Sequence, residues 1–173
     1  MHITKSSEKI TPFGGFNFCF ECFHQCGLAG LIDRHLGSRV KTAGFSYSEI
    51  IANQLGIFLT GGDCAEDLSE HLRGPLDQIR GMCVCSADTL LRGIKELSCP
   101  SQELVNPDSG VVHQFNINAN LNDLLLKALR TTGQLTPGVA YDLDYDNQVI
   151  PTEKWDAART YKKSAGPVNA FLM

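Results

Sequence analysis

Apolar residues recur at spacings of three and four along most of residues 16–133, and this period predicts a mainly α-helical chain. Serine, aspartate or asparagine precedes several of these segments as a potential N-cap, and glycines follow them as potential stops. Ser46 or Ser48 would cap the third helix, Asp63 the fourth, and Asn118 or Asn120 the last. We expect helices over residues 16–26, 28–36, 46–60, 63–72, 86–97 and 118–132, and a loop over residues 100–110.

Two of the predicted helices carry a distinct apolar face. The spacing in the helix after Ser46 predicts that its buried residues are Ile50, Ile51, Leu55, Phe58 and Leu59. The helix after Ser86 is predicted to bury Ala87, Leu90, Leu91, Ile94 and Leu97. The helices on either side of Gly61 and Gly62 would form a helical hairpin or a helix-turn-helix.

A β-favouring pattern starts only at Val139 and ends at Pro151. In an extended strand, Asp142, Asp144 and Asp146 would lie on one face, because side chains alternate between faces. Such a row of carboxylates is relieved by a hard divalent ion such as Mg²⁺, which predicts a metal-dependent phosphoryl-transfer site. The alternative is an edge strand whose charged face is simply solvated.

Composition describes an ordinary globular protein of one or two domains, with 173 residues, 43% hydrophobic and 20% charged. A net charge of −4 argues against a strongly basic nucleic-acid binder but leaves room for a local basic face. The sequence contains no apolar run of membrane-spanning length and no secretory signal pattern, so we expect no membrane association and a cytoplasmic location.

The seven cysteines are expected to be reduced thiols, since their number is odd and the chain lacks an export signal. A zinc site would draw its ligands from Cys19, Cys22, His24, Cys26, Cys83 and Cys85. Because Cys19, Cys22 and Cys26 share a helical stripe with phenylalanines, burial as small hydrophobic residues is the favoured interpretation. No pattern pairs a cysteine with a histidine as a nucleophile.

Several phrases, read in order, resemble a known family. They are Ile10-Thr11-Pro12-Phe13-Gly14-Gly15, Leu31-Ile32-Asp33-Arg34-His35-Leu36-Gly37, Gly61-Gly62-Asp63-Cys64-Ala65-Glu66-Asp67, Cys85-Ser86-Ala87-Asp88-Thr89-Leu90-Leu91-Arg92 and Leu143-Asp144-Tyr145-Asp146-Asn147. The ordered set resembles the amino-terminal part of a bacterial insertion-sequence transposase of the DDE type, in the group known as transposase DDE domain group one. The resemblance runs from about residue 10 to Lys163.

This resemblance implies a helical, helix-turn-helix-like DNA-binding region over residues 1–133. Residues 134–173 would begin a ribonuclease-H-like α/β domain, truncated after its first strands. In the parent enzyme, Asp146 would be a catalytic Mg²⁺ ligand, with Asp144 as the second candidate. Gln148 departs from the family, in which a threonine is more usual at that position.

The family's second aspartate and its glutamate would lie beyond this chain, and the resemblance ends after Lys163. A frameshift or premature stop would produce this pattern. Two-metal catalysis needs ligands that clamp both the attacking and the leaving oxygen. We therefore expect this chain, taken by itself, not to cleave DNA or to carry out transposition.

The candidate DNA contacts lie in two places. Thr89, Arg92 and Lys95 recur at three-residue spacing on the helix after Ser86, where they would suit phosphates or guanine edges. Arg39 and Lys41 belong to a basic connection that would contact the DNA backbone. A solvated helix face and a solvated loop are the alternatives.

The expected partner is DNA carrying the terminal inverted repeats of the mobile element, and an unfinished sheet would favour self-association or pairing with full-length transposase. Two other functions remain open. The chain would be a DNA-binding fragment that competes with full-length transposase, or an unrelated helical interaction or regulatory domain.

Overall fold

The computed structural model describes residues 10–40, 44–105, 107, 110, 112–115, 118–142, 149–151 and 168–170. The chain divides into two compact units, Met1–Ser98 with Asn118–Thr136, and Cys99–Ile117 with Pro137–Met173. Helices make up the first unit and short strands lie in the second, so the predicted mainly helical class is confirmed. The predicted domain division after residue 133 stays a prediction, although residues 99–117 group with the second unit.

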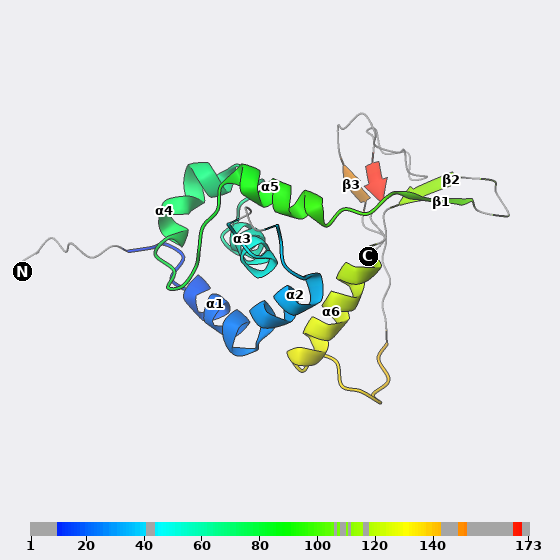
Figure 1. The fold of residues 1–173 in the computed structure, drawn as a ribbon, viewed down its shortest axis with the longest axis horizontal. Helices are drawn as coiled ribbons and strands as arrows, with labels where there is room; N and C mark the ends of the chain where they lie inside the picture. Colours follow the sequence, from blue (N-terminus) through cyan, green and yellow to red (C-terminus); the bar gives the residue numbers. More distant parts are fainter. Residues whose placement is uncertain are drawn as a thin grey trace, which may run out of the picture. The chain divides into compact units, whose positions relative to one another are not determined.

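The first unit is a cluster of helices around α3, which is seen nearly end-on in Figure 1. Its elements are α1 (Phe16–Gln25), α2 (Leu28–Leu36), α3 (Tyr47–Leu59), the π-helix η1 (Leu68–Leu72), α4 (Arg73–Leu76), α5 (Ala87–Glu96) and α6 (Ala119–Thr131). Helices α1, α2, α5 and η1 contact α3, and α6 contacts α2. No helix in the ranges described is long and apolar enough to cross a bilayer.

The core of this unit forms where these helices meet α3. Ile50, Leu68, Leu76 and Leu90 are fully buried there, and Phe16, Phe20 and Phe23 cover the core from α1. Burying side chains of this size contributes roughly 1.5–3 kcal/mol each. Apolar burial from several segments therefore holds α3 and α5 in place.

The helix starts follow the local capping chemistry. The Ser46 hydroxyl accepts from the Glu49 backbone N–H, and the Glu49 carboxylate accepts from the Ser46 N–H at 2.7 Å, which is a capping box. Ser86 caps α5 and Asn118 caps α6 in the same way, through their side-chain oxygens. Of the alternatives left open, Ser46 and Asn118 are the caps.

The turn after α3 differs from the prediction. Asp63 does not cap a helix, and residues 63–66 form a bend and turn before η1. The carboxylate of Asp67 instead accepts from the backbone N–H groups of Asp63 at 2.7 Å and Cys64 at 3.2 Å, which holds the pKa of Asp67 below its ordinary value. The predicted helix over residues 63–72 was therefore wrong in its first half.

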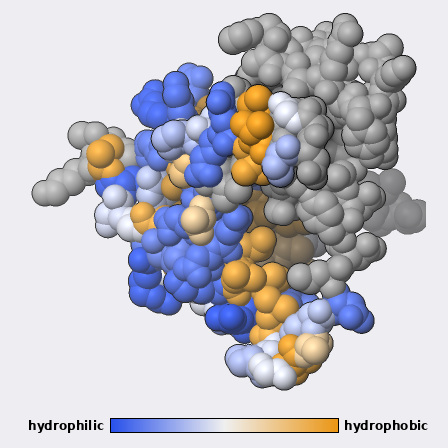
Figure 2. Space-filling model, turned by 90° about the vertical axis from the view of Figure 1, so that its right-hand side faces the viewer, coloured by the Kyte–Doolittle hydropathy of each residue, from blue (hydrophilic) through white to orange (hydrophobic). Residues whose placement is uncertain are grey.

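The predicted buried faces of α3 and α5 were wrong in part. Phe58 and Leu59 are 63% and 58% exposed, because Ile57 and Gly56 are the residues that face the core at that end of α3. On α5, Leu91 and Ile94 are 47% and 42% exposed, whereas Leu90 and Gly93 are buried. Exposed apolar residues also lie among hydrophilic ones on the face shown in Figure 2.

The second unit contains two antiparallel strand pairs. Strands β1 (Gln102–Val105) and β2 (Val112–Phe115) pair in a register that places Leu104 opposite His113, and β3 (Val149–Pro151) pairs with β4 (Val168–Ala170). The predicted loop over residues 100–110 therefore contains a strand, and strand structure begins well before Val139. Both of these predictions were wrong.

The acidic segment lies mostly outside the described residues. Residues 139–142, including Asp142, are not in a strand, so the strand predicted from Val139 was wrong over that stretch. Asp144 and Asp146 lie outside the described residues, and their proposed role as Mg²⁺ ligands stays a prediction. Strand β3, Val149–Pro151, covers the last residues of the predicted strand.

Candidate functional site

Helix α5, which carries three of the candidate DNA contacts, is seated closely on α3. Its residue Gly93 faces Ile50, and a Cβ atom built on Gly93 would lie 2.9–3.0 Å from three carbons of Ile50. Leu90, one turn earlier, is fully buried. Only a residue without a side chain allows this approach, so α5 is held with a defined rotation about its axis.

That rotation decides where the predicted contacts lie. Arg92 and Lys95 are exposed, whereas Thr89 is half-buried and its hydroxyl lies 2.9 Å from that of the capping Ser86. Neither Arg92 nor Lys95 has an ion-pair partner within 4.0 Å among the side chains that the structure describes. The outer side of α5 therefore presents two accessible cations, and Thr89 belongs to the N-terminal cap.

Arg39 is placed differently from the expectation of a DNA-contacting loop. Its guanidinium makes two hydrogen bonds of 2.8 Å to the carboxylate of Glu96, and Nη1 donates to the Phe45 carbonyl at 2.9 Å. The Arg39 side chain is only 3% exposed and lies 5.7 Å from the centre of the Tyr47 ring. In this arrangement Arg39 is not available to a phosphate, and Lys41 lies outside the described residues.

The electrostatics of this cluster follow from the same contacts. The Arg39 hydrogen bonds hold the pKa of the Glu96 carboxyl below its ordinary value and raise the pKa of Arg39. Burial, followed by the Glu96 charge, raises the pKa of the Tyr47 phenol. Arg39 is the main partner of Glu96, the acid next to Lys95, and the charge of Arg92 acts on the same carboxylate more weakly.

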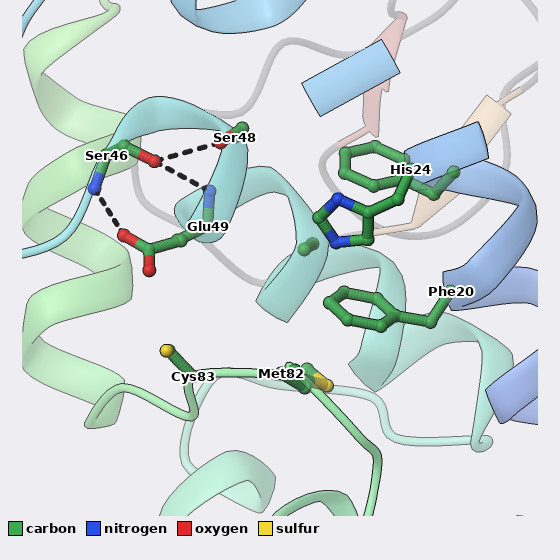
Figure 3. Close-up of a pocket in the computed structure, with 10 residues that line it drawn as sticks. Phe20, His24, Ser46, Ser48, Glu49, Met82 and Cys83 are labelled. Carbon is green, nitrogen blue, oxygen red and sulfur yellow. Dashed lines mark hydrogen bonds between the residues drawn. The ribbon is translucent and has the colours of Figure 1, made fainter. Parts of the chain in front are cut away.

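A pocket of about 290 Å³ lies between α1, the start of α3 and the segment before α5. Figure 3 shows Phe20 and His24 on one side of it, with Glu49 and Cys83 on the other. The His24 ring meets Phe20 edge-on, with ring centres 4.6 Å apart. The capping box of α3 thus forms one wall of the pocket.

The chemistry of this pocket does not favour nucleophilic catalysis by Cys83. Burial raises the pKa of the Cys83 thiol, and the neighbouring Glu49 carboxyl raises it further, so the thiolate is disfavoured near neutral pH.

The nearby Ser48 hydroxyl donates to Asp33 at 2.7 Å, and the Ser48 N–H donates to the same carboxylate at 2.9 Å. Ser48 and Asp33 therefore join α2 to the start of α3.

The sequence did not indicate this pocket, because its walls come from three segments far apart in the chain. The one local signal was the Ser46-to-Glu49 spacing of a capping box, which predicts a helix start and carries no information about a cavity. His24 and Cys83 line the same pocket, although no sequence pattern had paired them.

The prediction that Cys19, Cys22 and Cys26 are buried was wrong. Cys19 and Cys22 are exposed and Cys26 is half-buried, because the phenylalanines of α1 occupy its core-facing side. Cys85 is the cysteine that is buried, and burial raises its pKa to about 11. Within the ranges described, no three His, Cys, Asp or Glu side chains converge as metal ligands, so they supply no zinc set of the kind considered.

Comparisons with known proteins found no protein similar to this chain. No protein-family model, no curated protein and no solved structure gave a significant match to the chain.

Proposed function

We propose that this chain is part of a DDE-type transposase and that its helical unit binds DNA through the outer side of α5. The sequence support is the ordered set of phrases that resemble that family, one of which runs from Cys85 to Arg92 and covers the first half of α5. The observation that carries the proposal is the exposure of Arg92 and Lys95 on a helix whose rotation is set by contact with α3.

A helix of this kind suits DNA for two physical reasons. Arginine and lysine side chains neutralise phosphates and release counterions, and arginine also makes paired hydrogen bonds to guanine. A helix held by packing presents such side chains at fixed spacing, which is what reading a groove requires. Arg92 and Lys95 lie three residues apart, on neighbouring turns of α5.

The Arg39–Glu96 pair supports the same surface indirectly. It neutralises the acid at the end of α5 and ties the segment after α2 to that end of the helix. We therefore propose that Arg39 positions α5 and does not itself contact DNA. Thr89 has a capping role at the start of α5, so the proposed phosphate contacts are Arg92 and Lys95.

The resemblance also extends the proposal to catalysis in the parent enzyme. There, Asp146, or Asp144 in its place, would be a ligand of the catalytic Mg²⁺. This part of the proposal depends on the resemblance, because both residues lie outside the described ranges.

A gel-shift titration tests the DNA proposal. The purified chain is titrated against a duplex carrying the inverted repeats that flank its coding sequence, and against a scrambled duplex of equal length and composition, at a stated salt concentration. Tighter binding to the repeat duplex is expected. Equal affinity for the two duplexes would remove specific recognition, and no binding to either at low salt would remove the DNA proposal altogether.

A further inference from the structure

Two thiols lie close together on the solvent side of α1. The Sγ atoms of Cys22 and Cys26 are 3.6 Å apart, and these residues are one helical turn from each other. Phe16, Phe20 and Phe23 bury the other side of this helix. The pair is thus accessible to solvent and is carried on a helix whose orientation is set by the core.

The two sulfurs interact with each other in this arrangement. Their hydrogen bond raises the pKa of the Cys26 thiol above its ordinary value. A soft cation bound between the two sulfurs would take the place of this shared proton.

Helix geometry disfavours a disulfide between these cysteines. Residues one turn apart on a helix have Cβ atoms about 5–6 Å apart, whereas a disulfide needs roughly 3.5–4.5 Å between Cβ atoms and about 2.05 Å between sulfurs. Closing that bond would distort α1 next to the three buried phenylalanines. A single atom bridging the sulfurs leaves them farther apart and requires no such distortion.

We propose that Cys22 and Cys26 form a two-thiolate binding site for a soft, thiophilic cation of the Cu(I) class. Thiolate ligands select soft ions such as Cu(I), whereas structural zinc takes four ligands and hard ions take oxygens. Within the described ranges no third His, Cys, Asp or Glu lies close enough to complete a set of ligands. This favours an ion that is stably bound by two ligands. On binding, both thiols release their protons to solvent and no electrons are transferred.

The site is tested by anaerobic Cu(I) titration of the reduced, full-length chain in competition with bathocuproine disulfonate, a colorimetric Cu(I) chelator. Matched variants are Cys22→Ser and Cys26→Ser at the site, Cys19→Ser one turn earlier on the same helix, and Cys64→Ser in the turn after α3. The far-UV circular dichroism of each variant checks that the helices are retained. A parallel incubation with a small disulfide, followed by intact mass measurement, detects an internal disulfide.

We expect the wild type and the Cys19→Ser and Cys64→Ser variants to retain one tightly bound Cu(I). The Cys22→Ser and Cys26→Ser variants should each lose at least tenfold in affinity, because a two-ligand site cannot survive the loss of one ligand. Equal binding by all variants, loss of binding in Cys19→Ser, or no competition by the wild type would each overturn the assignment. So would ready formation of a Cys22–Cys26 disulfide. None of these results depends on DNA binding.

Discussion

Both carboxylate oxygens of Glu96 accept hydrogen bonds from the Arg39 guanidinium, each 2.8 Å long. The two residues are 57 positions apart, one in the segment between α2 and α3 and the other at the end of α5. With 3% of its side chain exposed, Arg39 depends on this partner and on the Phe45 carbonyl for its hydrogen bonds. The pair therefore links the segment between α2 and α3 to the end of α5.

Replacement of Glu96 by glutamine should lower the free energy of unfolding by about 1–2 kcal/mol, because a paired charged hydrogen bond to a buried guanidinium is lost. Arg39→Met and the double variant complete a double-mutant cycle, measured by urea unfolding. The two single changes should not add, since both remove the same interaction. An additive cycle would show that the pair contributes nothing to stability.

The same pair predicts a pH dependence. The Arg39 hydrogen bonds hold the pKa of Glu96 below its ordinary value of 4.5, so the folded state binds the Glu96 proton less readily than the unfolded state. The contribution of Glu96 to stability is then fully present above about pH 4.5 and is lost as the pH falls through the lowered folded-state pKa. The stability difference between wild type and Glu96→Gln, measured by urea unfolding across this range, should shrink on acidification. A stability difference that stays constant with pH would show that the Arg39 hydrogen bonds do not lower the pKa of Glu96.

Introducing a methyl group at Gly93 should destabilise the helical unit. The new Cβ would lie 2.9–3.0 Å from three carbons of Ile50, which is fully buried. Overpacking of this kind costs about 1–3 kcal/mol, which outweighs the gain of roughly 1 kcal/mol from alanine in a helix. We expect Gly93→Ala to lower the thermal midpoint. Ile50→Ala should cost less stability in the Gly93→Ala background than in the wild type, because alanine lacks the three carbons that the new Cβ would meet.

Gly30→Ala is the matched control for Gly93→Ala. Gly30 is also helical, but its Cβ would meet only the flexible end of the Arg34 side chain, at 3.0 Å. Here the helix propensity should dominate and stability should rise by up to about 1 kcal/mol. If the two alanine variants changed stability alike, the close packing of α5 on α3 would not be the cause of the effect of Gly93→Ala.

Replacing Asn53 by alanine should be among the most destabilising changes in the chain. Asn53 is fully buried, and its amide donates to the carbonyls of Glu49 and Cys83, each at 2.8 Å, while its oxygen accepts from the Cys85 N–H at 3.1 Å. Truncation removes the bond to the Cys83 carbonyl and leaves the buried Cys85 N–H without its partner, at a cost of about 2–4 kcal/mol. Chemical denaturation measures the loss, with the exposed Asn122→Ala on α6 as the control. A loss below about 1 kcal/mol would mean that water replaces the amide.

The helices could be predicted because their signals are local. The caps at Ser46, Ser86 and Asn118 and the glycine between α1 and α2 act within one turn of the residue concerned. Gly27 has a φ of 73°, which a residue with a side chain rarely adopts, and it marks that break plainly. At Asp63 the local prediction failed, because the Asp67 carboxylate accepts from the backbone N–H groups of Asp63 and Cys64 in a turn.

What could not be predicted depends on partners distant in sequence. Phe58 and Leu59 fit the period of α3, but the neighbouring elements pack against Gly56 and Ile57 instead. The β1–β2 hairpin had a weak signal in two short stretches with valines flanking a turn-rich segment, too short for a period to emerge.

The candidate site also contains features that the sequence predicts and features that only the fold reveals. The spacing of Arg92 and Lys95 on one helix was readable from the sequence, whereas the engagement of Arg39 by Glu96 required the fold. The pocket beside Glu49 likewise arises only when three segments meet. Charge patterns within an element are therefore predictable, and charge pairs between elements are not.

The salt dependence of DNA binding provides the most direct test of the α5 surface. Each phosphate contact contributes about 0.9 to the slope of log affinity against log salt, so the Arg92→Ala, Lys95→Ala double variant should reduce that slope by about 2. Its stability should change by less than roughly 0.5 kcal/mol, because both side chains are exposed. Arg130→Ala is the matched control, since Arg130 lies in the last turn of α6, on the opposite side of the helical unit from α5 (Figure 1). Should Arg130→Ala reduce the slope as much as the double variant does, binding would follow general charge and the α5 outer side would have no special role.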